Sequence, residues 1–376
     1  MRADFLPATF FTGATGFLGQ FVLRDLLVRG HRIVALVRGS LSDATVRLRN
    51  LLLPIGVDIN EYIEQGRLRL VDGALPDSLP EGDLGPIDSV INCAASIQLF
   101  SNGNGDPFKT NVAGTQAMID WVERRGIRRI FAVSTAYTCG WNSGVIREEF
   151  HHPEPKFQTD YERSKWIAEC LLQEWSARSG NVLTVFRPSF LIGDSKSGYT
   201  TQFGGFYQFA RLVSVLKQQF SHNGNGDRTY IPLRIPGRPE DRQNIVPVDY
   251  VARMIAEVVL RPEFQGRIYH LTNPEPPTND LMKRCYEDYF GLHGGYFADP
   301  DEVVGKCSKA ESLLWDRYEL ITPRVVHTPH FDVRNAREVA AAIGLEFPVL
   351  DKQRIFTMFD YAAAHRWGRG TDGFHG

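Results

Sequence analysis

Short apolar runs alternate with longer segments of helical periodicity through the first half of the chain. The runs predict strands over residues 8–11, 32–37, 68–71, 89–93, 130–133 and 182–186. The segments between them repeat apolar residues at helical spacing and predict helices over 17–29, 43–53, 111–124 and 161–177. The apolar runs are continuous rather than alternating, as in a parallel sheet covered on both faces. This order of elements predicts an α/β fold with a doubly wound parallel sheet.

The regular pattern stops after Arg187-Pro188, and the next segment is rich in Gly, Ser, Gln and Asn. A helix predicted over 248–260 and a strand over 267–271 resume the α/β pattern, after which the chain is mostly helical in pattern. The sequence therefore predicts a nucleotide-binding domain made of residues 1–194 and 241–272. We expect residues 195–240 and 273–376 to form a smaller, mostly helical lobe that binds the substrate.

Composition limits the class of protein. Lys and Arg number 42 against 44 Asp and Glu, and the resulting net charge of −2 excludes a bulk attraction to nucleic acid. The five cysteines form no CxxC pair, which favours free thiols in a reducing compartment over disulfides or a metal site. No apolar run approaches the ~18 residues of a membrane span. We expect a cytoplasmic protein with no metal, no nucleic-acid partner and no membrane span.

A glycine-rich loop lies between the first predicted strand and the first predicted helix. Glycines at this place allow a tight turn and a close approach of the backbone to a pyrophosphate, while the helix amino terminus offers free N–H groups. A plain surface turn is the alternative, but the position in a run of strand–helix units favours nucleotide binding in a Rossmann fold. The candidate nucleotide contacts are Gly13, Thr15, Gly16, Phe17, Leu18 and Gly19.

The end of the second predicted strand distinguishes the two nicotinamide cofactors. Proteins that bind NAD usually carry an acid there, about 20 residues after the glycines, to hold the ribose 2′-hydroxyl. This chain has Arg38 and no acid, and Arg47 follows on the next helix. Although a solvated surface arginine is the alternative, a guanidinium suits a 2′-phosphate, so we expect NADPH as the cofactor.

Tyr161 and Lys165 are four residues apart and share one face of a predicted helix. A lysine ammonium beside a phenol favours the phenolate, so Lys165 is expected to lower the pKa of Tyr161. Thr135 follows the predicted strand 130–133, at the edge of the sheet where ligands bind. A hydroxyl, a phenol and a lysine around one carbonyl oxygen predict a hydride-transfer site, whereas an exposed helical pair is the alternative for Tyr161 and Lys165 alone.

With these motifs the chain resembles an extended short-chain dehydrogenase/reductase, in the branch of thioester reductases and fatty acyl-CoA reductases. The resemblance runs from Thr12 to about Tyr250. The segments that carry it are residues 12–19, 36–38, 92–95, 111–115, 134–137, 161–165 with Glu169, 187–189 and 246–250.

The resemblance implies roles for individual residues. Thr135 would be the hydroxyl donor, Tyr161 the acid, and Lys165 the residue that holds the nicotinamide ribose. The residues expected to line the cofactor are Ala94, Ala95, Asn111, Pro188 and Ser189. The family usually has Gly-Asp-Leu after its third strand, and this chain departs from it with Asp72-Gly73-Ala74-Leu75. Either Asp72 reaches the adenine from a shifted register, or the backbone alone holds that ring.

The function implied is reduction of an acyl thioester, carried on CoA or on an acyl carrier protein, to an aldehyde and, with a second hydride, to an alcohol. Candidate substrate contacts are Gln98, Phe100, Tyr137 and Phe206, for which ordinary packing is the alternative. Two other functions remain open. One is an extended-family ketone or alcohol dehydrogenase or a sugar-nucleotide epimerase, and the other is a non-catalytic NADP-sensing protein.

Overall fold

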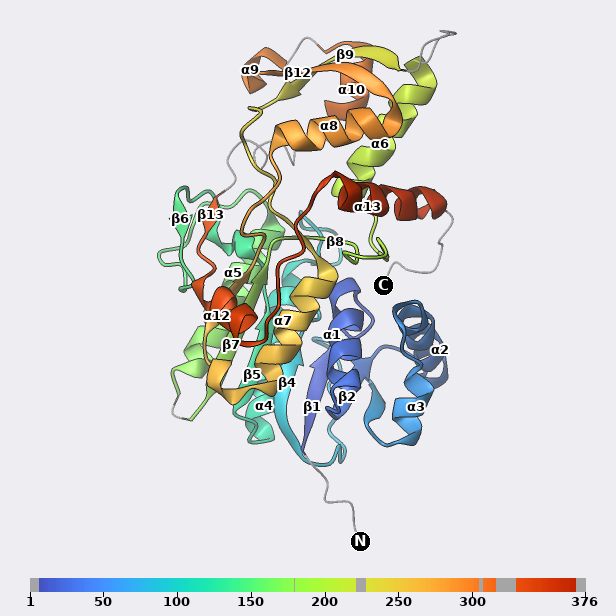
Figure 1. Ribbon diagram of the computed structural model, residues 1–376. Coiled ribbons are helices and arrows are strands. Elements are labelled where there is room, and N and C mark those ends of the chain that lie inside the picture. The colour runs from blue at the N-terminus through green and yellow to red at the C-terminus, as the bar shows by residue number, and fades with distance from the viewer. Residues whose placement is uncertain (1–6, 179, 221–227, 304–306, 316–328, 370–376) are drawn as a thin grey trace. The chain divides into compact units, whose positions relative to one another are not determined.

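The computed structural model describes residues 7–178, 180–220, 228–303, 307–315 and 329–369. The chain divides into two compact units (Figure 1). Unit 1 is made of residues 1–189, 249–272 and 331–346, and unit 2 of residues 190–248, 273–330 and 347–376.

Unit 1 is built on a seven-stranded sheet in which every paired strand is parallel. In spatial order its strands are β11 (Ile268–Leu271), β7 (Val182–Pro188), β5 (Arg129–Val133), β4 (Ile87–Asn92), β1 (Ala8–Thr12), β2 (Ile33–Val37) and β3 (Leu68–Asp72). The chain runs outward from β1 in one direction and then from β4 in the other, so the point of reversal lies between β1 and β4. This topology confirms the predicted doubly wound fold, and the predicted strands agree with the observed ones to within two residues.

Helices cover both faces of this sheet. Figure 1 shows α1 (Phe17–Val28) and α7 (Val248–Leu260) in front of the strands and α4 (Gly114–Arg124) and α5 (Asp160–Ser176) behind them. The core behind the sheet joins Trp121 of α4 and Trp175 of α5 to strand residues such as Phe10 and Val90. The other elements of unit 1 are α2 (Leu41–Leu52), η1 (Leu53–Ile55), α3 (Ile59–Glu64), the π-helical turn η2 (Lys109–Ala113), η3 (Ala136–Cys139), β6 (Val145–Ile146), η4 (Pro262–Phe264) and α12 (Arg334–Ala342).

Residues 331–346 belong to unit 1, although the sequence pattern assigned them to the smaller lobe. The backbone N–H of Asp332 donates to the carbonyl of Ile146 at 2.8 Å, and the amide of Asn335 donates to the carbonyl of Ile268 at 2.8 Å. Since such long-range contacts leave no mark in local periodicity, the sequence could not place this segment. Residues 190–194 and 241–248 likewise fall in unit 2 rather than in the predicted nucleotide-binding domain.

Unit 2 is mostly helical and carries two short pairs of parallel strands. Its strand pairs are β8 (Phe190–Ile192) with β10 (Ile245–Pro247) and β9 (Thr229–Pro236) with β12 (Leu292–Ala298). The remaining elements are α6 (Phe206–Phe220), α8 (Asn279–Phe290), α9 (Pro300–Val303), α10 (Lys309–Trp315), α13 (Lys352–Ala364) and η5 (Arg366–Gly368). At the boundary between the units, β13 (His330–Phe331) pairs with β6. Aromatic rings fill the core of unit 2, with Phe206 and Tyr286 each stacked on Phe359. Among the described residues of the whole chain, no helix is both long and apolar enough to cross a membrane.

Candidate active site

The glycine loop connects β1 to α1 in close contact with the backbone that follows β4. Gly13 has a φ of +80°, and a Cβ on it would lie 2.5 Å from the backbone nitrogen of Ala94. A Cβ on Gly19 would collide with the carbonyl oxygen of Gly13. Only glycine therefore fits at both positions, and the turn leaves the backbone bare, as a pyrophosphate requires.

The first turn of α1 is open to an anion. Its N-cap residue is Gly16, no side chain caps the helix, and the first turn contains no acidic residue. The first N–H groups of the helix and its positive dipole end are thus available to the phosphates of a dinucleotide. Phe17, Leu18 and Gly19 supply this turn and Thr15 precedes it, so the predicted loop residues fit that ligand.

Arg38, Arg47 and Asp72 come together beyond the end of β2. Arg38 is exposed, and Arg47 of α2 donates from Nη2 to the carbonyl oxygen of Arg38 at 3.0 Å. Asp72, at the end of β3, accepts the backbone N–H of Gly39 at 3.1 Å. The carboxylate of Asp72 therefore holds the loop that carries Arg38. Arg49, two residues after Arg47 on α2, is paired with Asp58 at 2.9 Å and does not join this group.

Thr135 and Tyr161 meet at the carboxyl edge of the sheet. Thr135 lies just beyond β5 and is 4% exposed, and its hydroxyl hydrogen-bonds the phenol of Tyr161. Burial raises the pKa of Tyr161 to about 12, against the lowering effect of that hydrogen bond. The residues of the chain therefore keep the phenol protonated at neutral pH, contrary to the expected lowering by Lys165. The physical reason is that desolvation outweighs the other effects on the phenol.

Lys165 lies one helical turn after Tyr161 and is buried. Its Nζ donates to the carbonyl oxygen of Val133 at 2.8 Å, which attaches the lysine to the end of β5. Burial lowers the pKa of Lys165 to about 8, while Glu169 and Cys93 raise it. The ammonium is thus charged at neutral pH but close to titration. Cys93, which follows β4, was not predicted as a site residue, although its position at a strand end could have indicated one.

Asn111 joins the loop after β4 to α5. Its side chain accepts the backbone N–H of Ser96 at 2.8 Å and donates to the carbonyl of Ser96 and to the hydroxyl of Ser164, both at 2.9 Å. Because these bonds occupy the amide, the structure gives Asn111 a bracing contact, whereas the resemblance implied only a place beside the cofactor. Asn111 itself is in the π-helical turn η2, a distortion often found at functional sites.

The loop braced by Asn111 carries several predicted residues. Ala94 is half-buried, whereas Ala95, Gln98 and Phe100 are exposed. The backbone N–H of Tyr161 donates to the carbonyl of Leu99 at 3.3 Å, so the exposed loop runs beside the first turn of α5. Gln98 and Phe100 flank Leu99, which contacts Tyr161, and both side chains are exposed. Their position is therefore compatible with a contact to the substrate.

The remaining predicted residues differ in their surroundings. Tyr137, in η3 after Thr135, packs its ring against Phe331. Pro188 ends β7, and the hydroxyl of the adjacent Ser189 is buried without a hydrogen-bond partner among the described residues. An orphaned hydroxyl at the strand edge fits a polar group of a ligand, such as a carboxamide. Phe206, a candidate substrate contact, is a buried core residue of unit 2, in keeping with the packing alternative.

Comparison with known proteins gives the family. Residues 11–255 match the model of an NAD-binding family described as male sterility protein. The chain belongs to this family. The match confirms the resemblance to extended short-chain dehydrogenases/reductases of the thioester reductase-like branch. The family match supports a nicotinamide dinucleotide as the cofactor of this domain.

Curated relatives of this male sterility family member are similar over most of the chain. Aldehyde reductase lnbA of Aspergillus flavus is 27% identical over 298 residues, which are 74% of this chain and 27% of that protein. The L-2-aminoadipate reductase large subunit of Penicillium chrysogenum is 27% identical over 292 residues, 71% of this chain and 19% of that protein. The chain thus spans about a quarter of these relatives or less.

A solved structure shares the fold. The terminal R domain from the myxalamid PKS-NRPS biosynthetic pathway matches with a TM-score of 0.76 and 24% identity, and the match covers 96% of this chain and 91% of that one. This likeness establishes the fold of the chain.

Replacing Gly19 by alanine tests the glycine loop. Because the added Cβ would collide with the carbonyl of Gly13, the loop must open, and we expect binding of a nicotinamide dinucleotide to weaken about tenfold or more. Gly82 has open space around it, so Gly82→Ala is the matched control. Titration calorimetry with both variants checks this, and equal affinities would contradict it.

One buried and one half-buried histidine, His270 and His151, predict an acid-sensitive fold. Burial lowers the pKa of His151 to about 4 and of His270 to about 3, below the ordinary value near 6.5. As pH falls from about 6.5 to 4, the unfolded chain therefore binds two protons that the folded chain does not, and stability is lost. Glu148 opposes this with one proton, since burial raises its pKa to about 7. His31, whose pKa burial also lowers, acts in the same direction as His151 and His270. From pH 7 to 5 we expect His151, His270 and Glu148 alone to give a net loss of about 1 to 2 kcal/mol.

The variant His151→Gln removes one of the two histidine protons and leaves Glu148 to balance the other. Its free energy of unfolding should therefore change little between pH 7 and 5, as measured by urea denaturation at each pH. The exposed neighbour His152, replaced in the same way, is the matched control. The same effect of pH on His151→Gln as on the unaltered protein would overturn this explanation.

Proposed function

We propose that this protein is an NADPH-dependent reductase of an acyl thioester, which it converts to an aldehyde. The observation that carries the proposal is the placement of Tyr161 and Lys165 one helical turn apart on α5, with the lysine bonded to the end of β5 and Thr135 just beyond that strand. Thr135 follows β5, and Tyr161 lies in the first turn of α5. Both hydroxyls therefore belong to the carboxyl edge of the sheet, where reacting groups bind. The names of the relatives, an aldehyde reductase and an L-2-aminoadipate reductase, support the same chemistry.

The residues of the chain suit addition of hydride to a carbonyl. When bound, the nicotinamide supplies the hydride. Thr135 and Tyr161 donate hydrogen bonds to the carbonyl oxygen as it gains negative charge, which is where preorganised donors have their largest effect. Tyr161 transfers its proton to that oxygen, and the resulting hemithioacetal loses its thiol to leave the aldehyde. Lys165 would hold the nicotinamide ribose.

The carrier of the acyl group is either CoA or an acyl carrier protein, and a second hydride transfer at the same residues would give the alcohol. A sensor without catalysis would not need a half-buried phenol and a buried lysine on one helix turn, because burying polar groups is costly. A ketone dehydrogenase would use the same residues, so the substrate itself must distinguish the two enzymes.

The first test follows NADPH oxidation with acyl-CoA and carrier-bound thioesters and identifies the products by mass. We expect thioester-dependent oxidation, and a loss of about 100-fold or more in kcat for Tyr161→Phe, because the general acid is removed. Binding of NADPH should be little changed in that variant. Tyr230 is exposed in unit 2, so Tyr230→Phe is the matched control.

Oxidation of NADPH with free ketones but with no thioester would replace the proposal by a ketone reductase. Tight binding of NADPH without turnover of any carbonyl would favour the sensor.

The preference for NADPH rests on Arg38, Arg47 and the absence of an acid at the end of β2. Arg38→Ala removes one charge-assisted partner of a 2′-phosphate and should weaken NADPH binding about 10- to 100-fold, while NADH binding stays the same. Arg49→Ala is the control, since Arg49 is engaged with Asp58. Fluorescence titration with both cofactors measures the ratio, and an equal loss for the two would refute the role of Arg38.

A further inference from the structure

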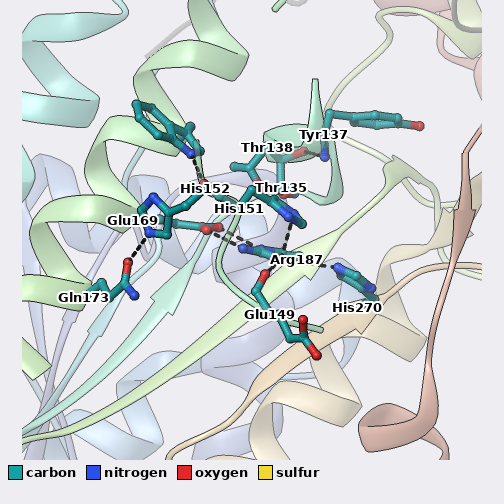
Figure 2. A network of polar contacts seen from close by, with 11 residues as sticks. Thr135, Tyr137, Thr138, Glu149, His151, His152, Glu169, Gln173, Arg187 and His270 are labelled. Atoms are coloured by element: carbon teal, nitrogen blue, oxygen red, sulfur yellow. Dashed lines mark hydrogen bonds and ion pairs between the residues drawn. The ribbon is translucent and has the colours of Figure 1, made fainter. Parts of the chain in front are cut away.

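Arg187 is a fully buried cation at the end of β7, immediately behind the proposed active site. Its guanidinium pairs with both carboxylate oxygens of Glu169 on α5, from Nε to Oε1 at 3.0 Å and from Nη2 to Oε2 at 2.6 Å. Figure 2 shows this pair at the centre of a polar network beside Thr135. The two-point contact fixes the carboxylate in position and orientation.

The other side of the guanidinium is held as firmly. Nη1 donates to the carbonyl of Glu149 at 2.9 Å, to Nε2 of His151 at 3.0 Å and to Nε2 of His270 at 3.4 Å (Figure 2). Arginine can only donate, so both histidines accept at Nε2. The Nδ1 of His270 must then carry its proton, which it donates to the carbonyl of Asp332 at 2.8 Å. Residues of four separate segments thus orient Arg187.

Glu169 connects this network to the proposed catalytic lysine. It lies one helical turn after Lys165 and is 2% exposed. Burial lowers the pKa of Lys165, and Glu169 is the first of the two groups that oppose this effect. The second is Cys93, whose own pKa burial raises to about 12, so its thiol stays neutral. Among the groups that act on Lys165, Glu169 therefore supplies the negative charge.

Stability alone does not explain such a pair. Replacing a buried ion pair by apolar residues of similar size is often neutral or stabilising, because taking two charges out of water costs about as much as their attraction returns. The Glu169–Arg187 pair also has no role in binding phosphate at the glycine loop, because that loop follows β1, and β4 and β5 lie between β1 and β7 in the sheet. The position of Glu169 one helical turn after Lys165 on α5 is what distinguishes the pair from a neutral filling of the same space.

We propose that Glu169 and Arg187 are positioning residues: Arg187, oriented by His151 and His270, holds the Glu169 carboxylate where it keeps the Lys165 ammonium charged during reduction. The proposal rests on the function proposed above for Lys165. It predicts that removal of the Glu169 charge neutralises the lysine near neutral pH, while the glycine loop remains intact.

The test measures the pKa of Lys165 directly, by NMR titration of protein labelled at the lysine side chains, with Lys165→Arg to assign the signal. In Glu169→Gln the pKa of Lys165 should fall by about one to three units. Because that variant leaves a buried guanidinium unpaired, the double variant Glu169→Gln/Arg187→Met is measured beside it, and thermal unfolding shows that each is folded. Glu174→Gln, an exposed carboxylate on the same helix, is the matched control.

Activity gives a second readout that a structural role would not change. In the double variant the alkaline limb of the kcat/KM profile should move to lower pH, so that turnover recovers on acidification. An unchanged pKa of Lys165 in the folded double variant, or the same change in Glu174→Gln, would overturn the proposal. A fall in the pKa of Lys165 without reduction of any thioester would support the pairing and refute the proposed function, so the two failures are distinguishable.

Discussion

The close approach of the glycine loop to the backbone after β4 determines where everything else in unit 1 can be. Thr12 and Asn92 end neighbouring strands and are joined by a hydrogen bond of 2.7 Å between their side chains. Beyond them the chain leaves β1 for one face of the sheet and β4 for the other, because the strand order reverses between these two strands. Gly13 fits against Ala94 only because it lacks a Cβ. In open α/β sheets such a reversal of strand order is where a dinucleotide lies across the strand ends.

Tyr161 and Lys165, one helical turn apart at this edge of the sheet, have pKa values displaced in opposite directions by the same cause. Burial disfavours the charged form of each, so the phenol of Tyr161 stays protonated and the ammonium of Lys165 moves toward neutrality. A proton donor to a carbonyl needs the first effect, and a cation beside it must resist the second. The buried carboxylate of Glu169 resolves this conflict, since it favours the charged lysine one helical turn away. Arg187 in turn makes the burial of that carboxylate tolerable.

Those parts of the site that follow local rules could be predicted from the sequence. The glycine loop, Arg38, Thr135, Tyr161 and Lys165 each adjoin a strand end or a helix start, where spacing and residue type carry the information. The bracing contacts of Asn111 and the partners of Arg187 could not be predicted, because they join segments that are distant in the chain. The pKa of Tyr161 was expected to fall for a related reason: helical spacing shows that Lys165 is near, but not that burial outweighs its charge.

Residues 331–346 show how far such distant contacts reach. Asp332 fixes the protonated nitrogen of His270, and the backbone N–H of Asn335 donates to Glu148 at 2.7 Å, while Glu148 also accepts the N–H of His270 at 2.9 Å. His270 is thereby held on both sides and presents Nε2 to Arg187. The segment therefore belongs to the same polar network as Glu169, although it follows that residue by more than 160 positions. A nucleotide-binding domain that ended at residue 272 would retain its sheet and its glycine loop but would lose the groups that orient the buried charges behind the catalytic edge.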